Sequence, residues 1–213
     1  MSALHRRSRA ITLDEIVDTW LPARVGALDD MLWVLELSDK YGDEVAINLH
    51  IEDGPGYRSN LRLLTEPMVA AGYLHARALL EFMGISAKNG ELVQIRHRRS
   101  GDLAIEHYFV NGAGLSMVTL DEVYAAINMP RAVVEWALVT TIERANKIFA
   151  HITTAEVLAM ALDSQVRVAL RGISMLVHNY LFAKLGRAEL IPIKCESTYS
   201  CNTCNDGERL DGD

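Results

Sequence analysis

The sequence has no long hydrophobic run, few cysteines and no excess of positive charge. No stretch of roughly 18 uninterrupted apolar residues occurs, so we expect no membrane-spanning helix. The three cysteines all lie between residues 195 and 204, which rules out a disulfide framework and is typical of a cytoplasmic protein. The net charge of −7 disfavours a general nucleic-acid binder, so any RNA contact is expected to be local.

Several signatures of cofactor and metal chemistry are also missing. The chain carries no Gly-x-Ser-x-Gly elbow, no dinucleotide fingerprint, no Walker loop and no His-Glu-x-x-His motif. The Gly-rich turn at residues 53–56 lacks the lysine and the strand-to-helix setting of a phosphate loop. Cys195, Cys201 and Cys204 have no histidine nearby and make a poor zinc site, because zinc normally takes four ligands. We therefore expect neither a metal nor a cofactor.

Composition divides the chain into three segments. Residues 1–11 are basic but lead into no apolar stretch, so we do not expect a secretory signal. Residues 12–186 carry helical periodicity and are long enough to bury one core as a single helical domain. Residues 187–213 lose this periodicity and contain the three cysteines, which predicts an irregular tail.

Helix starts are marked by capping boxes, in which a threonine and a glutamate three residues later satisfy each other's backbone donors. They begin at Thr12, Thr119 and Thr153. Ile16, Trp20 and Leu21 are expected to face inward, with a kink or restart at Pro22. Further helices are predicted over 65–83, with Pro67 in the first turn and Gly84 as C-cap, and after Pro130. A long helix over 154–185 is apolar around much of its circumference and should be central or lie at a dimer seam.

The β-structure should be minor. Residues 45–51 alternate between apolar and other side chains, which predicts a half-buried strand. Turn signals at Asn89-Gly90 and at 100–102 flank residues 92–97 and 103–109, which predicts a hairpin within 91–110. The expected fold is mainly α, a helical bundle of five or six helices with a small β-element.

Polar residues with a spacing suited to chemistry occur within 143–153. At 100° per residue, Arg144, Lys147 and His151 form one row along the border of the apolar face of the predicted helix. Side chains at such a border are expected to be half-exposed, as in a groove or a subunit seam. A row of this kind is also what the solvated edge of any amphipathic helix looks like.

The run Arg144 to His151, with Asn146-Lys147-Ile148-Phe149-Ala150-His151 at its centre, resembles the Arg-x-His signature of HEPN domains. Two features depart from the family pattern: six residues separate the arginine from the histidine, and Ala145 stands where a polar residue usually follows the arginine. A second resemblance, of Arg77 to Phe82 followed by Phe149 to Thr153, is to uncharacterised bacterial proteins and names no function.

The HEPN resemblance implies a homodimeric, metal-independent endoribonuclease of a bacterial toxin or defence system. His151 would be the acid/base, because imidazole titrates near neutral pH. Arg144 would stabilise the phosphate charge. Asn146 would orient the phosphate or His151, and Lys147 would add positive potential. The alternative is a non-catalytic helical dimerisation or protein-interaction domain.

Two further basic features have both a plain and a functional interpretation. Arg96, Arg98 and Arg99 either lie on a solvated turn or contact RNA phosphate from a loop. Arg77 and Glu81 form an i,i+4 pair, which is either a surface ion pair or places the arginine in the same groove as His151.

Overall fold

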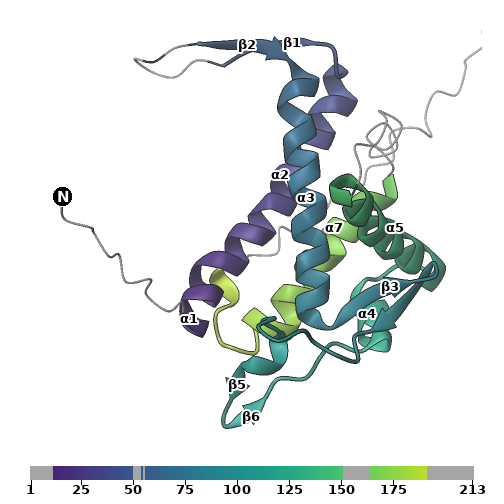
Figure 1. Ribbon diagram of the computed structural model, residues 1–213. Helices are drawn as coiled ribbons and strands as arrows, with labels where there is room; N and C mark the ends of the chain where they lie inside the picture. Colours follow the sequence, from purple (N-terminus) through teal and green to yellow (C-terminus); the bar gives the residue numbers. More distant parts are fainter. Residues whose placement is uncertain (1–11, 50–53, 55, 151–163, 191–213) are drawn as a thin grey trace, which may run out of the picture.

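The computed structural model describes residues 12–49, 54, 56–150 and 164–190, and the structural statements below concern these residues. The chain is mainly helical with three small two-stranded sheets, which confirms the predicted fold class (Figure 1). None of the described helices is both long and apolar enough to cross a membrane.

The first helical segment starts where its capping box predicts. The Thr12 hydroxyl accepts a hydrogen bond of 3.1 Å from the Glu15 amide, and α1 (Leu13–Glu15) follows. A π-helical turn, η1 (Ile16–Trp20), then leads into α2 (Leu21–Tyr41), with Pro22 in its first turn. A restart of the helix was predicted at Pro22, and it is confirmed: the π-helical turn ends at Trp20 and α-helical geometry begins at Leu21.

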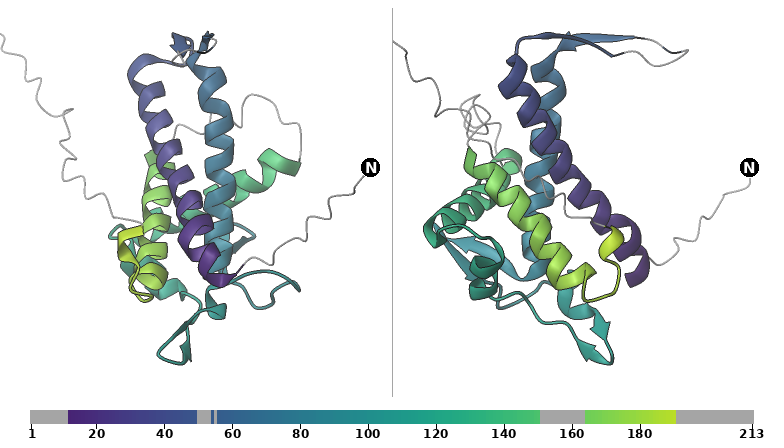
Figure 2. Two further views of the ribbon diagram at one scale, coloured as in Figure 1. Left: turned by 90° about the vertical axis from the view of Figure 1, so that its left-hand side faces the viewer. Right: turned by 180° about the vertical axis from the view of Figure 1, so that it is seen from behind.

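The helix α3 (Leu61–Met83) runs antiparallel to α2, and the two form a long pair (Figures 1 and 2). The Asn60 side chain caps α3 by accepting from the Leu63 amide at 3.1 Å. The helix therefore starts four residues earlier than predicted, and placing Pro67 in its first turn was wrong. Gly84 ends the helix with φ 97°, as predicted.

Each sheet is a two-stranded antiparallel ribbon. They are β1 (Ala46–Leu49) with β2 (Tyr57–Asn60), β3 (Ile85–Lys88) with β4 (Glu91–Gln94), and β5 (Phe109–Val110) with β6 (Ala113–Gly114). The predicted strand is confirmed at 46–49. The predicted pairing of 92–97 with 103–109 is wrong, because β4 folds back onto β3. Asn89 and Gly90, with φ of 54° and 81°, make the tight turn between them.

The rest of the described body contains α4 (Leu120–Ala126), α5 (Arg131–Ala150), α7 (Ser164–Val177) and the π-turn η4 (His178–Phe182). Two short 3₁₀ turns are η2 (Ile105–His107) and η5 (Ala188–Leu190). The Thr119 capping box is confirmed: the Thr119 amide donates to Glu122 Oε2 at 2.8 Å, and the Glu122 amide donates back at 3.3 Å. The third box, at Thr153, lies outside the described residues.

The helix α7 is the centre of the body. It packs against α2, α3, α4 and α5 (Figure 2). Its inward side chains, including Leu170, Ile173 and Leu176, are at most 1% exposed. The central position predicted for this region is confirmed over 164–177. Since the same chain covers this apolar face, α7 gives no reason to expect a dimer seam there.

Candidate functional site

Arg144 lies on the inner side of α5 and reaches α3. Its Nη1 donates a hydrogen bond of 2.9 Å to the hydroxyl of Tyr73, which is 1% exposed. Arg144 itself is only 8% exposed. The half-exposed position expected from helix geometry was therefore wrong, because α3 packs across this edge of α5 and covers the row at Arg144.

Two neighbours of Arg144 face solvent. Asn146 and Lys147 are both exposed, so the packing separates them from the arginine with which they share a helix. His151 lies outside the described residues. The described residues thus bring Arg144 together with Tyr73, but not with Asn146 or Lys147.

The guanidinium of Arg144 has no ion pair with any carboxylate in the described part of the chain. Burying an arginine without a counter-charge is costly, because water is lost and no opposite charge replaces it. A guanidinium carries five N–H donors. In this position it ties α5 to α3 through Tyr73, and it also has the chemistry to hold an anion.

The basic loop does not present its three arginines together. Arg98 points inward: Nη2 pairs with Glu106 Oε2 at 2.9 Å, and Nη1 donates to the carbonyl of Glu81 at the end of α3. The same carbonyl also accepts from the Gly84 amide at 3.1 Å, so Arg98 adds a second donor to the C-terminal end of α3. Arg96 and Arg99 are exposed, and the Arg99 amide closes the turn by donating to Asp102 at 3.1 Å. Arg98 therefore links Glu106 to the end of α3, whereas Arg96 and Arg99 remain on the surface.

The Arg77–Glu81 pair has the geometry of its plain interpretation. Arg77 Nε and Glu81 Oε1 are 2.9 Å apart, and both side chains are more than a third exposed. Exposed pairs of this kind contribute only a few tenths of a kcal/mol.

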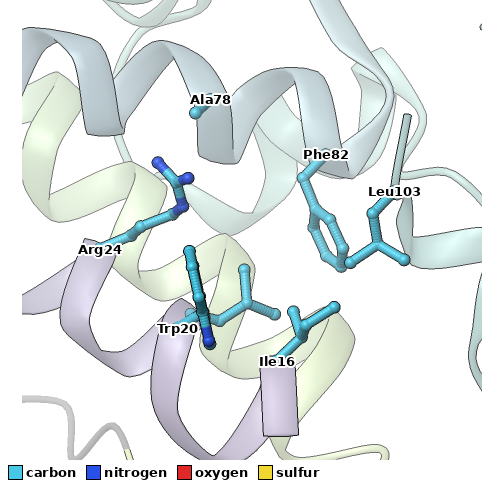
Figure 3. A pocket seen from close by; sticks show the side chains of 7 residues that line it. Ile16, Trp20, Arg24, Ala78, Phe82 and Leu103 are labelled. Atoms are coloured by element: carbon cyan, nitrogen blue, oxygen red, sulfur yellow. The ribbon is translucent and has the colours of Figure 1, made fainter. Parts of the chain in front are cut away.

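A pocket that the sequence did not indicate lies between η1, the start of α2 and the end of α3 (Figure 3). It encloses about 350 Å³. Its lining residues are Ile16, Trp20, Leu21, Arg24, Ala78, Phe82 and Leu103. Trp20 was expected to face inward but is 48% exposed, because it forms a wall of this open pocket instead of entering the core. The π-turn at residues 16–20 was the missing signal, and sequence periodicity does not reveal it.

The opposite end of the α2–α3 pair carries the β1–β2 ribbon (Figure 1). It is joined to α3 by backbone hydrogen bonds, from the Leu61 amide to the Val45 carbonyl at 2.8 Å and from the Arg62 amide to the Asp43 carbonyl at 2.9 Å. None of the side chains at 46–48 and 57–60 is buried. This ribbon therefore stands outside the core.

The described residues contain no group of three histidine, cysteine or acidic side chains able to hold a metal ion. Cys195, Cys201 and Cys204 lie outside the described residues. Comparison with protein-family models, with curated proteins and with solved structures found no match to this chain.

Proposed function

We propose that the protein is a helical self-association module in which two copies join through their β1–β2 ribbons. The observation that carries this proposal is the ribbon itself, whose side chains at 46–48 and 57–60 are half-buried or exposed. A lone two-stranded ribbon is marginal in water and gains stability from further strands or a covering layer. A second copy that pairs edge to edge supplies the further strands.

The edge formed by β1 is suited to pairing with itself. Its sequence, Ala46-Ile47-Asn48-Leu49, contains no charge and no proline, the residues that usually protect a free edge. In a two-fold antiparallel pair of β1 strands centred on Asn48, Asn48 lies opposite Asn48 of the second copy and Ile47 opposite Leu49, so no like charges meet. The result is a four-stranded sheet with two-fold symmetry, which is the commonest symmetry of homodimers.

Exposed apolar side chains near the ribbon support the same interface. Val45 is 39% exposed, Tyr57 is 51% exposed and Leu63 is 57% exposed. Tyrosine is enriched at protein interfaces because its ring is apolar and its hydroxyl can find a polar partner.

Light scattering during size-exclusion chromatography at about 10–100 µM tests the proposal, a range in which a dimer with micromolar affinity is populated. Wild type is expected at the mass of a dimer. The double substitution Ile47→Lys/Asn48→Lys places two positive charges opposite each other in the proposed register and is expected to give monomers. Val110→Lys, in the β5–β6 ribbon, is the matched control and should leave the mass unchanged. A monomeric wild type contradicts the proposal.

A second candidate function is the HEPN-like, metal-independent ribonuclease, and the burial of Arg144, which pairs with no carboxylate among the described residues, favours it. An arginine kept in the core without a described carboxylate partner is the kind of group that an RNA phosphate would neutralise. In this proposal His151 acts as acid/base, Arg144 stabilises the transition state, and the exposed Asn146 and Lys147 contact the RNA.

The ribonuclease proposal is tested with labelled RNA in EDTA. His151→Ala should lower the cleavage rate by about 10²–10⁴. Arg144→Ala should lower it by about 10²–10³, and the double variant should lose less than the product of the two. Lys88→Ala, an exposed lysine in β3, is the control and should cleave as wild type does. Wild-type protein that neither cleaves nor binds RNA leaves self-association as the function.

A further inference from the structure

We propose that the pocket between η1, α2 and α3 binds a small apolar carboxylic acid, with Arg24 holding the carboxylate. The site lies at the other end of the α2–α3 pair from the ribbon and does not depend on self-association. Figure 3 shows the Arg24 guanidinium at one side of the pocket, near Trp20 and Ala78, with Phe82 and Leu103 at the other side.

The walls select an apolar body. Apart from Arg24, the lining consists of aliphatic and aromatic side chains. The volume of about 350 Å³ falls at the lower end of the range of small-molecule sites, about 300–1,000 Å³. Phe82 is 6% exposed and forms a fixed wall, whereas Trp20 is half exposed and offers its indole to cover a ligand.

The charge of Arg24 selects an anion. Arg24 Nη1 lies 2.9 Å from His75 Nδ1, and since a guanidinium only donates, Nδ1 must be the acceptor. Burial lowers the pKa of His75, and the neighbouring positive charge of Arg24 lowers it further, so the histidine is held neutral. No carboxylate in the described part of the chain forms an ion pair with Arg24. Among the described residues, no opposite charge therefore lies beside the guanidinium, and the donors that do not face His75 are left for a ligand.

A carboxylate fits this site better than a phosphate does. One arginine matches one negative charge and can bind both carboxylate oxygens in a forked pair of hydrogen bonds. A phosphate monoester carries nearly two charges and would leave one of them against apolar walls. The neutral His75 adds no second cation.

The π-helical turn supplies a second, independent reason to place a ligand here. Residues Ile16 to Trp20 form η1, and both of its terminal residues line the pocket. Such turns are rare within α-helices and occur often at functional sites, because they displace side chains from the regular helical spacing.

The test uses Trp20 as its own reporter. The chain has three tryptophans, and Trp33 and Trp136 are about half exposed, so Trp33→Phe/Trp136→Phe leaves Trp20 as the single tryptophan in an intact full-length chain, excited selectively over the tyrosines. This variant is titrated with 4-phenylbutyrate and, separately, with its methyl ester. The acid should change Trp20 emission saturably. The ester should bind roughly ten- to hundred-fold more weakly, the ratio expected for losing a charged hydrogen bond.

Further substitutions in this background locate the site. Arg24→Gln should weaken the acid by the same factor and leave the ester unchanged. Ala78→Phe should fill the pocket and abolish both. Arg131→Gln, an exposed arginine at the start of α5, is the matched control and should bind like its parent. Melting curves accompany each variant, and if Arg24→Gln is unfolded, the acid–ester comparison on the parent protein decides.

Three results would overturn the inference. The first is equal binding of acid and ester, since Arg24 would then select nothing. The second is binding that survives Ala78→Phe. The third is absence of binding by the acid while a short peptide ending in phenylalanine with a free carboxylate binds, because the site would then recognise a chain terminus.

Discussion

A two-stranded ribbon lies at each end of the helix α3. The two ribbons have the same pattern of strand pairing but differ in how deeply their side chains are buried. Both β1–β2 and β3–β4 are antiparallel and have four residue pairs. In β3–β4, Ile85 is fully buried and Leu92 is 5% exposed, and the ribbon packs against α3, α4 and α5. In β1–β2, Ala46, Asn48, Tyr57 and Arg58 are all exposed.

The difference shows that the ladder alone does not place a ribbon in the core. Side chains on one face must meet an apolar layer, and the body formed by α5 and α7 offers that layer only to the β3–β4 end. Gln94 adds to the attachment, since its Nε2 donates to the carbonyls of Val118 at 2.9 Å and Gly84 at 3.3 Å. The β3–β4 ribbon belongs to the packed core, whereas the described residues of β1–β2 include no buried side chain.

The largest expected effect contrasts the two ribbons directly. Leu92→Ala should lower the free energy of unfolding by about 2–5 kcal/mol, because it removes a buried side chain and leaves a cavity. Ile47→Ala is the matched change in the outer ribbon and should cost less than about 1 kcal/mol in the monomer. Urea unfolding at low protein concentration measures both, and equal losses would remove the distinction between the ribbons.

Next in size is the polar contact inside the packed half. Tyr73→Phe removes the acceptor of a buried guanidinium and should cost about 1.5–3 kcal/mol. Replacing both partners, in Tyr73→Phe/Arg144→Met, should cost less than Tyr73→Phe alone, because no buried charge is then left unsatisfied. The comparison is made by thermal and urea denaturation. A double variant less stable than the single would show that Arg144 stabilises the fold through other contacts.

A smaller effect is expected where α2 and α3 touch along their pair. A Cβ added at Gly72 would lie 2.6 Å from Met31 Cβ, so Gly72→Ala should force the helices apart. Overpacking costs about 1–3 kcal/mol, less about 1 kcal/mol gained in helix propensity. Gly26→Ala in α2 meets nothing within 4 Å and should instead stabilise by up to about 1 kcal/mol. Opposite shifts in melting temperature are the expected result.

The smallest expected effect is on how the free energy of unfolding depends on pH, through His75 in α3. The pKa of His75 is lowered in the folded chain, so the unfolded chain binds more protons just below pH 6.5. The free energy of unfolding should therefore fall as pH drops from about 7 to 5. His75→Gln should flatten this slope relative to wild type, and His107→Gln is the control. An unchanged slope in His75→Gln would show that other groups cause it.

Local signals in the sequence predicted local structure well. The threonines at 12 and 119 cap their helices, Gly84 ends α3, and the alternation at 45–51 contains β1. These outcomes depend on a few neighbouring residues, so the pattern carries enough information. The start of α3 was predicted too late because Pro67 was taken as the sign of the first turn, whereas Asn60, seven residues earlier, is the N-cap.

Contacts between elements were not predictable in the same way. The Asn89-Gly90 turn was recognised, but its upstream strand at 85–88 was not, so β4 was assigned the wrong partner. The burial of Arg144 depends on α3, whose Tyr73 lies 71 residues away in the sequence. Arg24 and His75 likewise meet only across the α2–α3 pair. Helical periodicity tells which residues share a face, but not which helix covers that face.

The length of α2 has a mechanical consequence. The helix starts at the pocket, with Leu21 and Arg24 in its first turn, and ends at Tyr41 beside the ribbon. At 1.5 Å per residue it spans roughly 30 Å. It is packed against α3 along this length, with Leu28, Met31 and Leu35 at most 1% exposed, so it connects the pocket to the ribbon as part of one helix pair. A tilt of about 5° at the pocket moves the ribbon by roughly 2.5 Å, about half the spacing between neighbouring strands.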